Sequence, residues 1–216
     1  MENIGRFESI GEAWIGMLKH IEVSGVNRKY TDNTGESFDV RECFGLTMSV
    51  AHPYLPDPII EKYKVQEEYD WMVDNFTSFE RVKELSNASS YASRLYAYQD
   101  QKNQLEWVIG RLKDNPEQRS ATITTFEPLT DEKYIPCVSL LDFQKNLEDG
   151  SLDLYVYSRA LDFGCKAYVN MVMLAKILDN VSKECGYPVG KLEMVIKSAH
   201  YYTKDTDKVR RIMEQR

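Results

Sequence analysis

The residues best suited to chemistry begin at a proline–cysteine pair, Pro136-Cys137, which opens an apolar run typical of a buried strand. A cysteine thiolate is a strong nucleophile, and its pKa falls when cations lie beside it. The alternative is that Cys137 is only a small hydrophobic residue at the start of a core strand. We therefore expect Cys137 to act as a nucleophile if other polar groups converge on it.

Polar residues also stand at strand ends and inside an apolar helix. Arg159 and Asp162 follow a strand-like run, three residues apart, and Asn170 interrupts the apolar run AYVNMVMLAKIL. His200 and Tyr202 close a later strand. Each has a structural explanation on its own: a local salt bridge, a hydrogen-bonded core amide or a packed ring. Taken with the Pro-Cys pair, they form a candidate site.

The hydrophobic periodicity predicts the elements that must position this site. Strand-like runs occupy residues 44–58, 120–126, 137–143, 152–158 and 192–200, with a hairpin turn at 148–151 and a polar, turn-rich stretch at 29–38. Helical spacing occupies residues 8–21, 59–76, 105–112, 166–185 and about 205–215, whereas 85–98 has no clear pattern. Because no repeat or linker interrupts the chain, we expect one α+β domain over residues 1–216.

Composition excludes several classes of function. The chain has 216 residues and a net charge of −7, so a broad nucleic-acid surface is not expected, although a few converging arginines suffice for a small anion. No apolar run approaches the length of a membrane span, and the charged N-terminus is unlike a signal peptide. The cysteines fit no metal or redox spacing and the three histidines are scattered, so we expect reduced thiols, a cytoplasmic location and no metal.

In combination the motifs resemble the thymidylate synthase family. That family has Pro-Cys at the start of a strand, an R-S-x-D element, an asparagine eight residues after its aspartate, and H-x-Y at the end of a later strand. This chain has the same order in Pro136-Cys137, Arg159-Ala160-Leu161-Asp162, Asn170 and His200-Tyr201-Tyr202. The resemblance covers most of residues 8–204 and looks most like the compact archaeal branch. It implies a mixed β-sheet packed with helices and a homodimer formed through the sheets.

The family transfers a one-carbon unit to C5 of a pyrimidine nucleotide, here expected to be dUMP. The resemblance makes Cys137 the nucleophile that adds to C6 and so places negative charge on C5. Arg159 would lie beside the thiolate and bind the phosphate. Asn170 can donate a hydrogen bond to O4 and accept one from N3–H, which is the pattern of uracil, whereas an aspartate would suit cytosine.

Further stretches of the chain resemble other parts of the family's site. The implied roles are a C5-proton route for Tyr91, a proton relay for Glu68 with His200, sugar contacts for His200 and Tyr202, pterin binding for Asp162 and Trp71, and phosphate binding in the partner subunit for Arg119. A place in the core or in the pocket wall is the alternative for Trp71. A solvated, charged helix face is the alternative for Glu68. The implied donor is 5,10-methylene-tetrahydrofolate or a methanopterin analogue.

The chain departs from the family at several phosphate contacts. Ala160 replaces a serine, Ser120 stands where many relatives have a second arginine, and Asn33 replaces a phosphate-binding arginine for which nearby Arg28 is a substitute. Lys166 stands where relatives have glycine. The family's long C-terminal segment is also missing, and without a closing tail water can intercept the one-carbon intermediate. A 5-hydroxymethylase acting on dUMP, UMP, dCMP or CMP, and a non-catalytic nucleotide-binding relative, therefore remain as alternatives.

Overall fold

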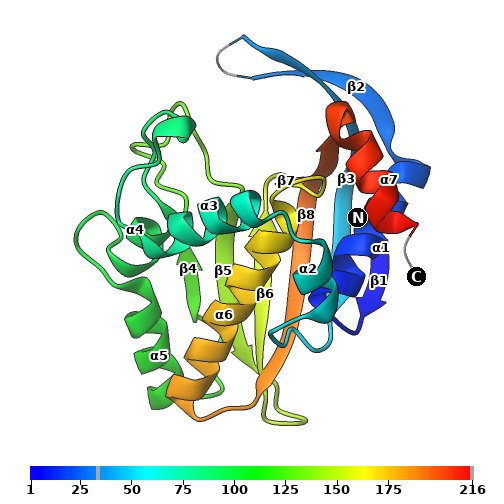
Figure 1. Ribbon diagram of the computed structural model, residues 1–216. Coiled ribbons are helices and arrows are strands. Elements are labelled where there is room, and N and C mark those ends of the chain that lie inside the picture. The colour runs from blue at the N-terminus through cyan, green and yellow to red at the C-terminus, as the bar shows by residue number, and fades with distance from the viewer. Residues whose placement is uncertain (33–34, 215–216) are drawn as a thin grey trace.

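A mixed β-sheet forms the centre of the computed structural model, which describes residues 1–32 and 35–214 (Figure 1). Within those ranges eight strands pair in the order β1-β3-β8-β6-β5-β4, with β2 added to β3 and β7 added to β8. The strands are β1 (Glu2–Phe7), β2 (Val26–Thr31), β3 (Ser37–Val50), β4 (Thr122–Thr124), β5 (Val138–Lys145), β6 (Leu152–Ser158), β7 (Leu161–Asp162) and β8 (Val189–Tyr202).

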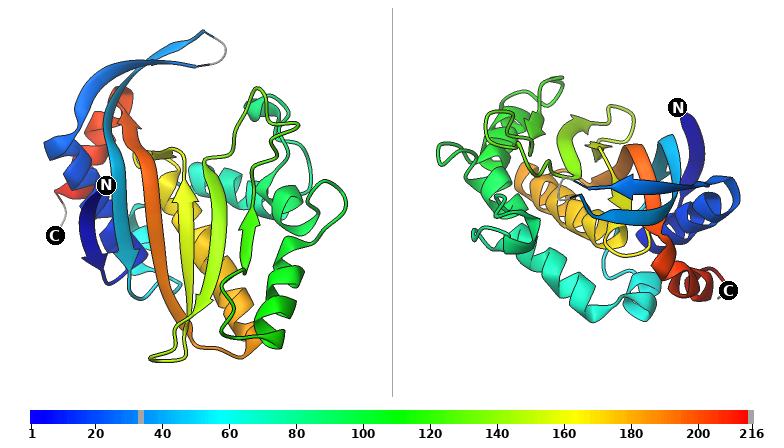
Figure 2. Two further views of the ribbon diagram at one scale, coloured as in Figure 1. Left: turned by 180° about the vertical axis from the view of Figure 1, so that it is seen from behind. Right: turned by 90° about the horizontal axis from the view of Figure 1, so that it is seen from above.

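Helices cover one face of this sheet and leave the other bare. Seen from behind, strands β3, β8, β6 and β5 lie in front of the helices (Figure 2). The helices are α1 (Ile10–Ser24), α2 (Pro58–Tyr63), α3 (Gln66–Thr77), α4 (Tyr91–Tyr96), α5 (Gln104–Asp114), α6 (Ala167–Cys185) and α7 (Thr206–Met213), with short 3₁₀ turns at Lys83–Leu85 and Thr203–Asp205.

The long helix α6 is the main cover of the sheet. It connects β6 and β7 to β8, and both of those strands run parallel to β8, an arrangement that requires a crossover connection. Most of α6 is buried, as its apolar sequence predicts. The helix ends at Gly186, whose φ of 74° is the left-handed conformation that glycine adopts without strain.

Other boundaries also follow from local chemistry. Ser9 caps α1 by accepting a hydrogen bond from the Glu12 backbone N–H. Asp57 caps α2 and also accepts from the Gly11 N–H, which joins the first two helices. Between β5 and β6, a turn with Gly150 at a φ of 76° closes the predicted hairpin.

The predicted α+β class, the hairpin and the helices near 105–112 and 166–185 are confirmed. The single helix predicted over 59–76 is wrong, because α2 and α3 are separate. Val65 lies at the break, where its N–H donates to the Tyr168 hydroxyl (3.1 Å) and its carbonyl accepts from it (3.3 Å). The polar, turn-rich stretch at 29–38 contains the end of β2 at Thr31 and the start of β3 at Ser37, which pair in antiparallel fashion.

Candidate functional site

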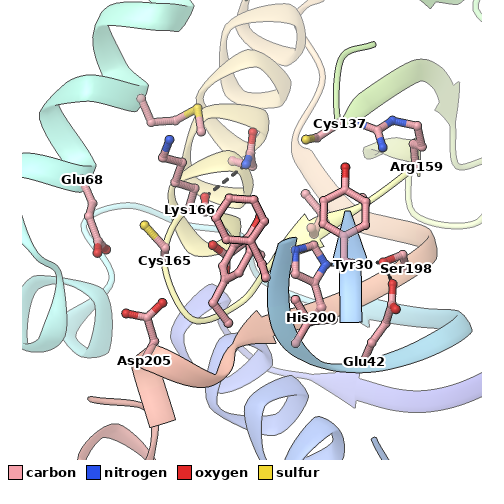
Figure 3. Close-up of a pocket in the computed structure, with 18 of the residues that line it drawn as sticks. Tyr30, Glu42, Glu68, Cys137, Arg159, Cys165, Lys166, Ser198, His200 and Asp205 are labelled. Atoms are coloured by element: carbon pink, nitrogen blue, oxygen red, sulfur yellow. Dashed lines mark hydrogen bonds between the residues drawn. The ribbon is translucent and has the colours of Figure 1, made fainter. Parts of the chain in front are cut away.

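A pocket of about 640 Å³ opens at the end of the sheet where several of its central strands begin or finish. The carboxyl ends of parallel strands β6 and β8 meet there, and the amino end of β5 joins them because β5 runs antiparallel to β6. The pocket is also lined from the β2–β3 hairpin, from α3 and from the start of α6 (Figure 3). Strand ends, which leave side chains free to converge, therefore supply most of this site.

Cys137 and Arg159 are neighbours across two paired strands. Val138 pairs with Ser158, and the Arg159 N–H donates to the Cys137 carbonyl at 2.7 Å. The guanidinium donates through Nη2 to the Ile135 carbonyl at 2.9 Å. Its buried Nε has no hydrogen-bond partner among the described residues. Arg159 thus places positive charge beside the thiol and keeps one donor available for a ligand.

The thiol of Cys137 is a protonated group in this pocket. Burial raises its pKa, and the opposing effects of Arg159, of a hydrogen bond from Tyr134 and of Lys166 do not cancel that increase. The expectation of a lowered pKa is therefore wrong for the pocket as it stands. The cations are in place, but burial outweighs them.

Tyr91 is anchored next to the nucleophile candidate. Its hydroxyl accepts a hydrogen bond from the Val138 N–H at 2.9 Å, and its ring stacks on Phe76. Burial raises the pKa of Tyr91 far above its ordinary value, with a further increase from Cys137. Tyr91 is consequently a neutral phenol held against the start of β5.

The side-chain amide of Asn170 offers its oxygen atom to a ligand in the pocket. Its Nδ2 donates to the Lys166 carbonyl at 3.1 Å, and the side chain is buried on α6. The buried Oδ1 finds no partner in residues 1–32 and 35–214. A buried amide oxygen normally has a hydrogen bond, so this atom is a ready acceptor for a ligand N–H.

Glu68 and Trp71 reach the pocket from α3. Glu68 forms an ion pair with Lys208 of α7, with 2.8 Å between Oε1 and Nζ, and its side chain is only 19% exposed. The solvated-face alternative for Glu68 therefore does not apply. The Trp71 ring lies 3.7 Å from the Lys166 ammonium, a cation–π contact that fixes both side chains at the pocket wall.

Asp162, His200 and Tyr202 also line the pocket, each with a strongly altered acidity. Burial, followed by the charge of Asp205, raises the pKa of Asp162 to about 7. Burial and Arg159 lower the pKa of His200 to about 4, so its ring is neutral at physiological pH. Burial raises the pKa of Tyr202 to about 12.

Of the residues at the phosphate contacts considered from the sequence, some line the pocket and others do not. Arg28 and Ala160 line the pocket, and the Arg28 guanidinium lies 3.3 Å from Glu42. Arg119 is exposed and is not among the pocket-lining residues of its own chain. Asn33 lies outside the described residues.

The sequence interpretation missed several pocket residues. Tyr134, Cys165 and Asp205 line the cavity, and Lys208 contacts its wall through Glu68. Tyr134 precedes the Pro-Cys pair by only one residue, so proximity in sequence was an available signal for it. Lys208 had none, because its place depends on how α7 packs.

Comparison with known proteins agrees with this geometry. A sequence model described as thymidylate synthase matches residues 59–216. A protein of Methanosarcina acetivorans described as "Putative thymidylate synthase" is 30% identical over 214 residues, which cover 97% of this chain and 94% of that protein. One of Methanosarcina mazei with the same description is 30% identical over 222 residues, which cover 99% of both chains.

A third relative carries a different activity in its description. The "Deoxyuridylate hydroxymethyltransferase" of Bacillus phage SP01 is 32% identical over 109 residues, which cover 48% of this chain and 28% of the phage protein. Together, fold, pocket and sequence similarity define a transferase class that acts on pyrimidine nucleotides. The chain belongs to the thymidylate synthase family.

Family membership confirms the predicted fold, a mixed sheet packed with helices. It also implies a transferase that uses a pyrimidine nucleotide and a folate-type cosubstrate. None of the helices in the described ranges is long and apolar enough to cross a membrane.

Proposed function

We propose that this protein transfers a one-carbon unit from a reduced pterin donor to C5 of dUMP, through covalent attack of Cys137 on C6. The observation that carries the proposal is the unpartnered Oδ1 of Asn170, buried in the same pocket as Cys137 and Arg159. A uracil ring offers the N–H that this oxygen lacks, and the second hydrogen of Nδ2 is available for O4.

The chemistry divides among the residues around the base. The Cys137 sulfur forms a bond to C6, and the ring electrons move toward O4, where the Asn170 amide stabilises them. Arg159 and Tyr134 stabilise the thiolate as the thiol loses its proton, and Arg159 also receives the nucleotide phosphate. After C5 has bonded to the one-carbon unit, the C5 proton leaves along the side of the ring near Tyr91, and the bond between the one-carbon unit and the donor breaks. In the last step the bond from the Cys137 sulfur to C6 breaks, which restores the double bond between C5 and C6 and frees the thiolate.

The remaining pocket residues bind the sugar and the donor. Neutral His200 and Tyr202 offer hydrogen bonds to the sugar hydroxyl, and Asp162 and Trp71 hold the pterin ring. Glu68 relays protons through water near O4. The donor, 5,10-methylene-tetrahydrofolate or a methanopterin analogue, supplies the one-carbon unit and, for a methyl product, the hydride.

The proposal includes a homodimer and a cytoplasmic location. The bare face of the sheet carries Leu140, Tyr155 and Tyr157, all more than a third exposed, which is the kind of surface that a second copy of the chain covers. Arg119, which is exposed and does not line the pocket of its own chain, would then serve the phosphate site of the partner. All four cysteines are free, which suits a reducing compartment.

A hydroxymethyl product is the second candidate. Its support is the similarity to the phage deoxyuridylate hydroxymethyltransferase over about half of this chain. In that reaction water adds to the one-carbon unit at C5, and no hydride is transferred. Both candidates use the same nucleotide contacts, and exclusion of water from the pocket at this step favours hydride transfer and the methyl product.

Mass spectrometry of the products distinguishes these functions. The protein is incubated with dUMP, UMP, dCMP or CMP and with each of the two donors. We expect methylated dUMP, no product from Cys137→Ser, and full activity from Cys185→Ser, because Cys185 does not line the pocket. A hydroxymethylated nucleotide would support the second candidate. Nucleotide binding without product or C5-proton exchange would indicate a non-catalytic relative and overturn the proposal.

A further inference from the structure

Lys208 joins the last helix to the wall of the pocket opposite Cys137. Its Nζ lies 2.8 Å from Glu68 Oε1 and 3.7 Å from Asp205 Oδ1. The Lys208 side chain is only 23% exposed, so these are not loose surface ion pairs. Figure 3 shows Glu68 and Asp205 on one side of the pocket, with Cys137 and Arg159 on the other.

This wall contains an excess of negative charge. Asp162, Asp205 and Glu68 supply three carboxyl groups, and in the described part of the chain the ion pairs of Glu68 and Asp205 both go to Lys208. The charges of Asp205 and Glu68 raise the pKa of Asp162, and the charge of Lys208 lowers it. Lys208 is thus the cation that offsets the mutual repulsion of this cluster.

The other titratable groups around Asp162 do not take over that task. Cys165 and Tyr202 have pKa values raised to about 12, the pKa of Cys137 is raised as well, and that of His200 is lowered to about 4, so all four are neutral near pH 7. The ammonium groups of Lys166 and Lys204 lie over the rings of Trp71 and Tyr202. Removing the charge of Lys208 would therefore leave Asp162 facing two carboxylates that have lost their ion-pair partner.

We propose that Lys208 is a positioning residue of the pterin subsite, which holds Glu68 in place and keeps Asp162 partly ionised near pH 7 so that it accepts a hydrogen bond from the donor ring. The inference rests on the proposed function, because Asp162 has this task only if a pterin binds there. It adds a residue of α7 that touches neither substrate.

The expected effect has a definite sign. At pH 7 an Asp162 with a pKa of about 7 is about half ionised. If loss of Lys208 raises that pKa by about one unit, the ionised fraction falls about fivefold. Affinity for the donor then falls by the same factor, whereas the nucleotide, held by Arg159 and Asn170, binds as before.

The test compares Lys208→Met with Lys208→Arg and with Arg211→Met. Arg211 is on the same helix but exposed, and within the described residues its side chain donates to the Asp207 backbone, so its variant matches the charge change without touching the wall. The measurements are KM for donor and nucleotide across the pH range, with the melting temperature of each variant.

We expect Lys208→Met to raise the donor KM about fivefold near pH 7 and to move the acid limb of kcat/KM for the donor to higher pH. The nucleotide KM stays unchanged, Lys208→Arg restores the profile, and Arg211→Met behaves as wild type. An unmoved acid limb, or equal loss for both substrates, would overturn the inference and leave Lys208 a purely structural residue.

A failure of the proposed function can be distinguished from a failure of this inference. If the wild-type protein forms no product with any nucleotide and donor, the proposed function fails, and the Lys208 variants are compared by calorimetric binding of tetrahydrofolate in the presence of dUMP. Weaker tetrahydrofolate binding in Lys208→Met alone would still support the inference, and equal binding in all variants would overturn it.

Discussion

At the residue scale, the burial of Cys137 has a measurable consequence. Because its thiol pKa is raised, alkylation by iodoacetamide should accelerate steadily from about pH 6 to about pH 9. Arg159→Gln removes the largest opposing charge and raises the pKa further, so alkylation at a fixed pH should slow about tenfold if the pKa rises by about one. Peptide mass spectrometry follows Cys137 and Cys185 in the same sample.

Cys185 is the internal control for that experiment, because it lies outside the pocket and Arg159 does not affect its pKa. Its rate should be the same in both proteins, and dUMP should protect Cys137 but not Cys185. A rate at Cys137 that does not change with pH would show that the thiolate already exists at rest, contrary to the effect of burial.

Asn170 should determine the choice of base. Asn170→Asp replaces the donor half of the amide with a second acceptor, which suits the amino group of cytosine and opposes uracil O4. We expect turnover of dUMP to fall at least a hundredfold and that of dCMP to rise, measured as kcat/KM. Asn180→Asp, at an exposed position of the same helix, should change neither. Retained dUMP turnover in Asn170→Asp would remove Asn170 from base recognition.

The sequence predicted the site residues that lie close to one another along the chain. Cys137, Arg159, Asp162 and Asn170 lie within 34 positions on one hairpin and the following helix, so strand pairing and helical spacing were enough to group them. The place of Lys208 depends on the long-range packing of α7 against α1 and on its ion pair with Glu68 of α3, which no local pattern encodes. The pKa of Cys137 was predicted in the wrong direction because the extent of burial cannot be read from neighbouring residue types.

At the scale of elements, two glycines test how helix geometry contributes to stability. Gly186→Ala places a Cβ on a residue with a φ of 74° and should lower the free energy of unfolding by about 1 kcal/mol. Gly110→Ala, in the middle of α5 with open space around it, should raise it by about 0.5–1 kcal/mol.

Urea denaturation measures both variants, and their activities should equal that of the wild type because neither glycine lines the pocket. Equal effects of the two substitutions would contradict the left-handed end of α6.

The sequence predicted strands correctly where one face of the strand is buried. It missed strands of which neither face is buried. The alternation in β5 and β6 reflects a buried side, and both strands were predicted. Strand β2 is exposed along its whole length, and β1 has no fully buried residue, so their sequences carry no periodic apolar signal. They are strands because β3 provides an edge to pair with, which is a tertiary cause.

At the scale of the whole molecule, the bare sheet face should determine the oligomeric state. Tyr157 pairs with Leu140 and with Val195 across neighbouring strands, which makes a continuous apolar patch. Tyr157→Asp should therefore convert a dimer to a monomer in sedimentation velocity, whereas Lys29→Asp, on the exposed strand β2, should not. A wild-type protein that sediments as a monomer would contradict the proposed dimer.

The role of Arg119 across that dimer can be tested by mixing. Cys137→Ala and Arg119→Ala should each be inactive, but subunits exchanged between them should regain up to about a quarter of wild-type activity, because one site in each mixed dimer has both residues. No recovery after verified exchange would place Arg119 outside the partner's site.

The path of the chain through the pocket implies an order of assembly during synthesis. Cys137, Arg159 and Asn170 are all made by residue 170, and they come together through short connections. The donor side remains incomplete until Lys208 has emerged and α7 has docked on Glu68. A growing chain should thus acquire the capacity to capture a nucleotide before it can use one, and arrested chains of increasing length would reveal the two capacities in that order.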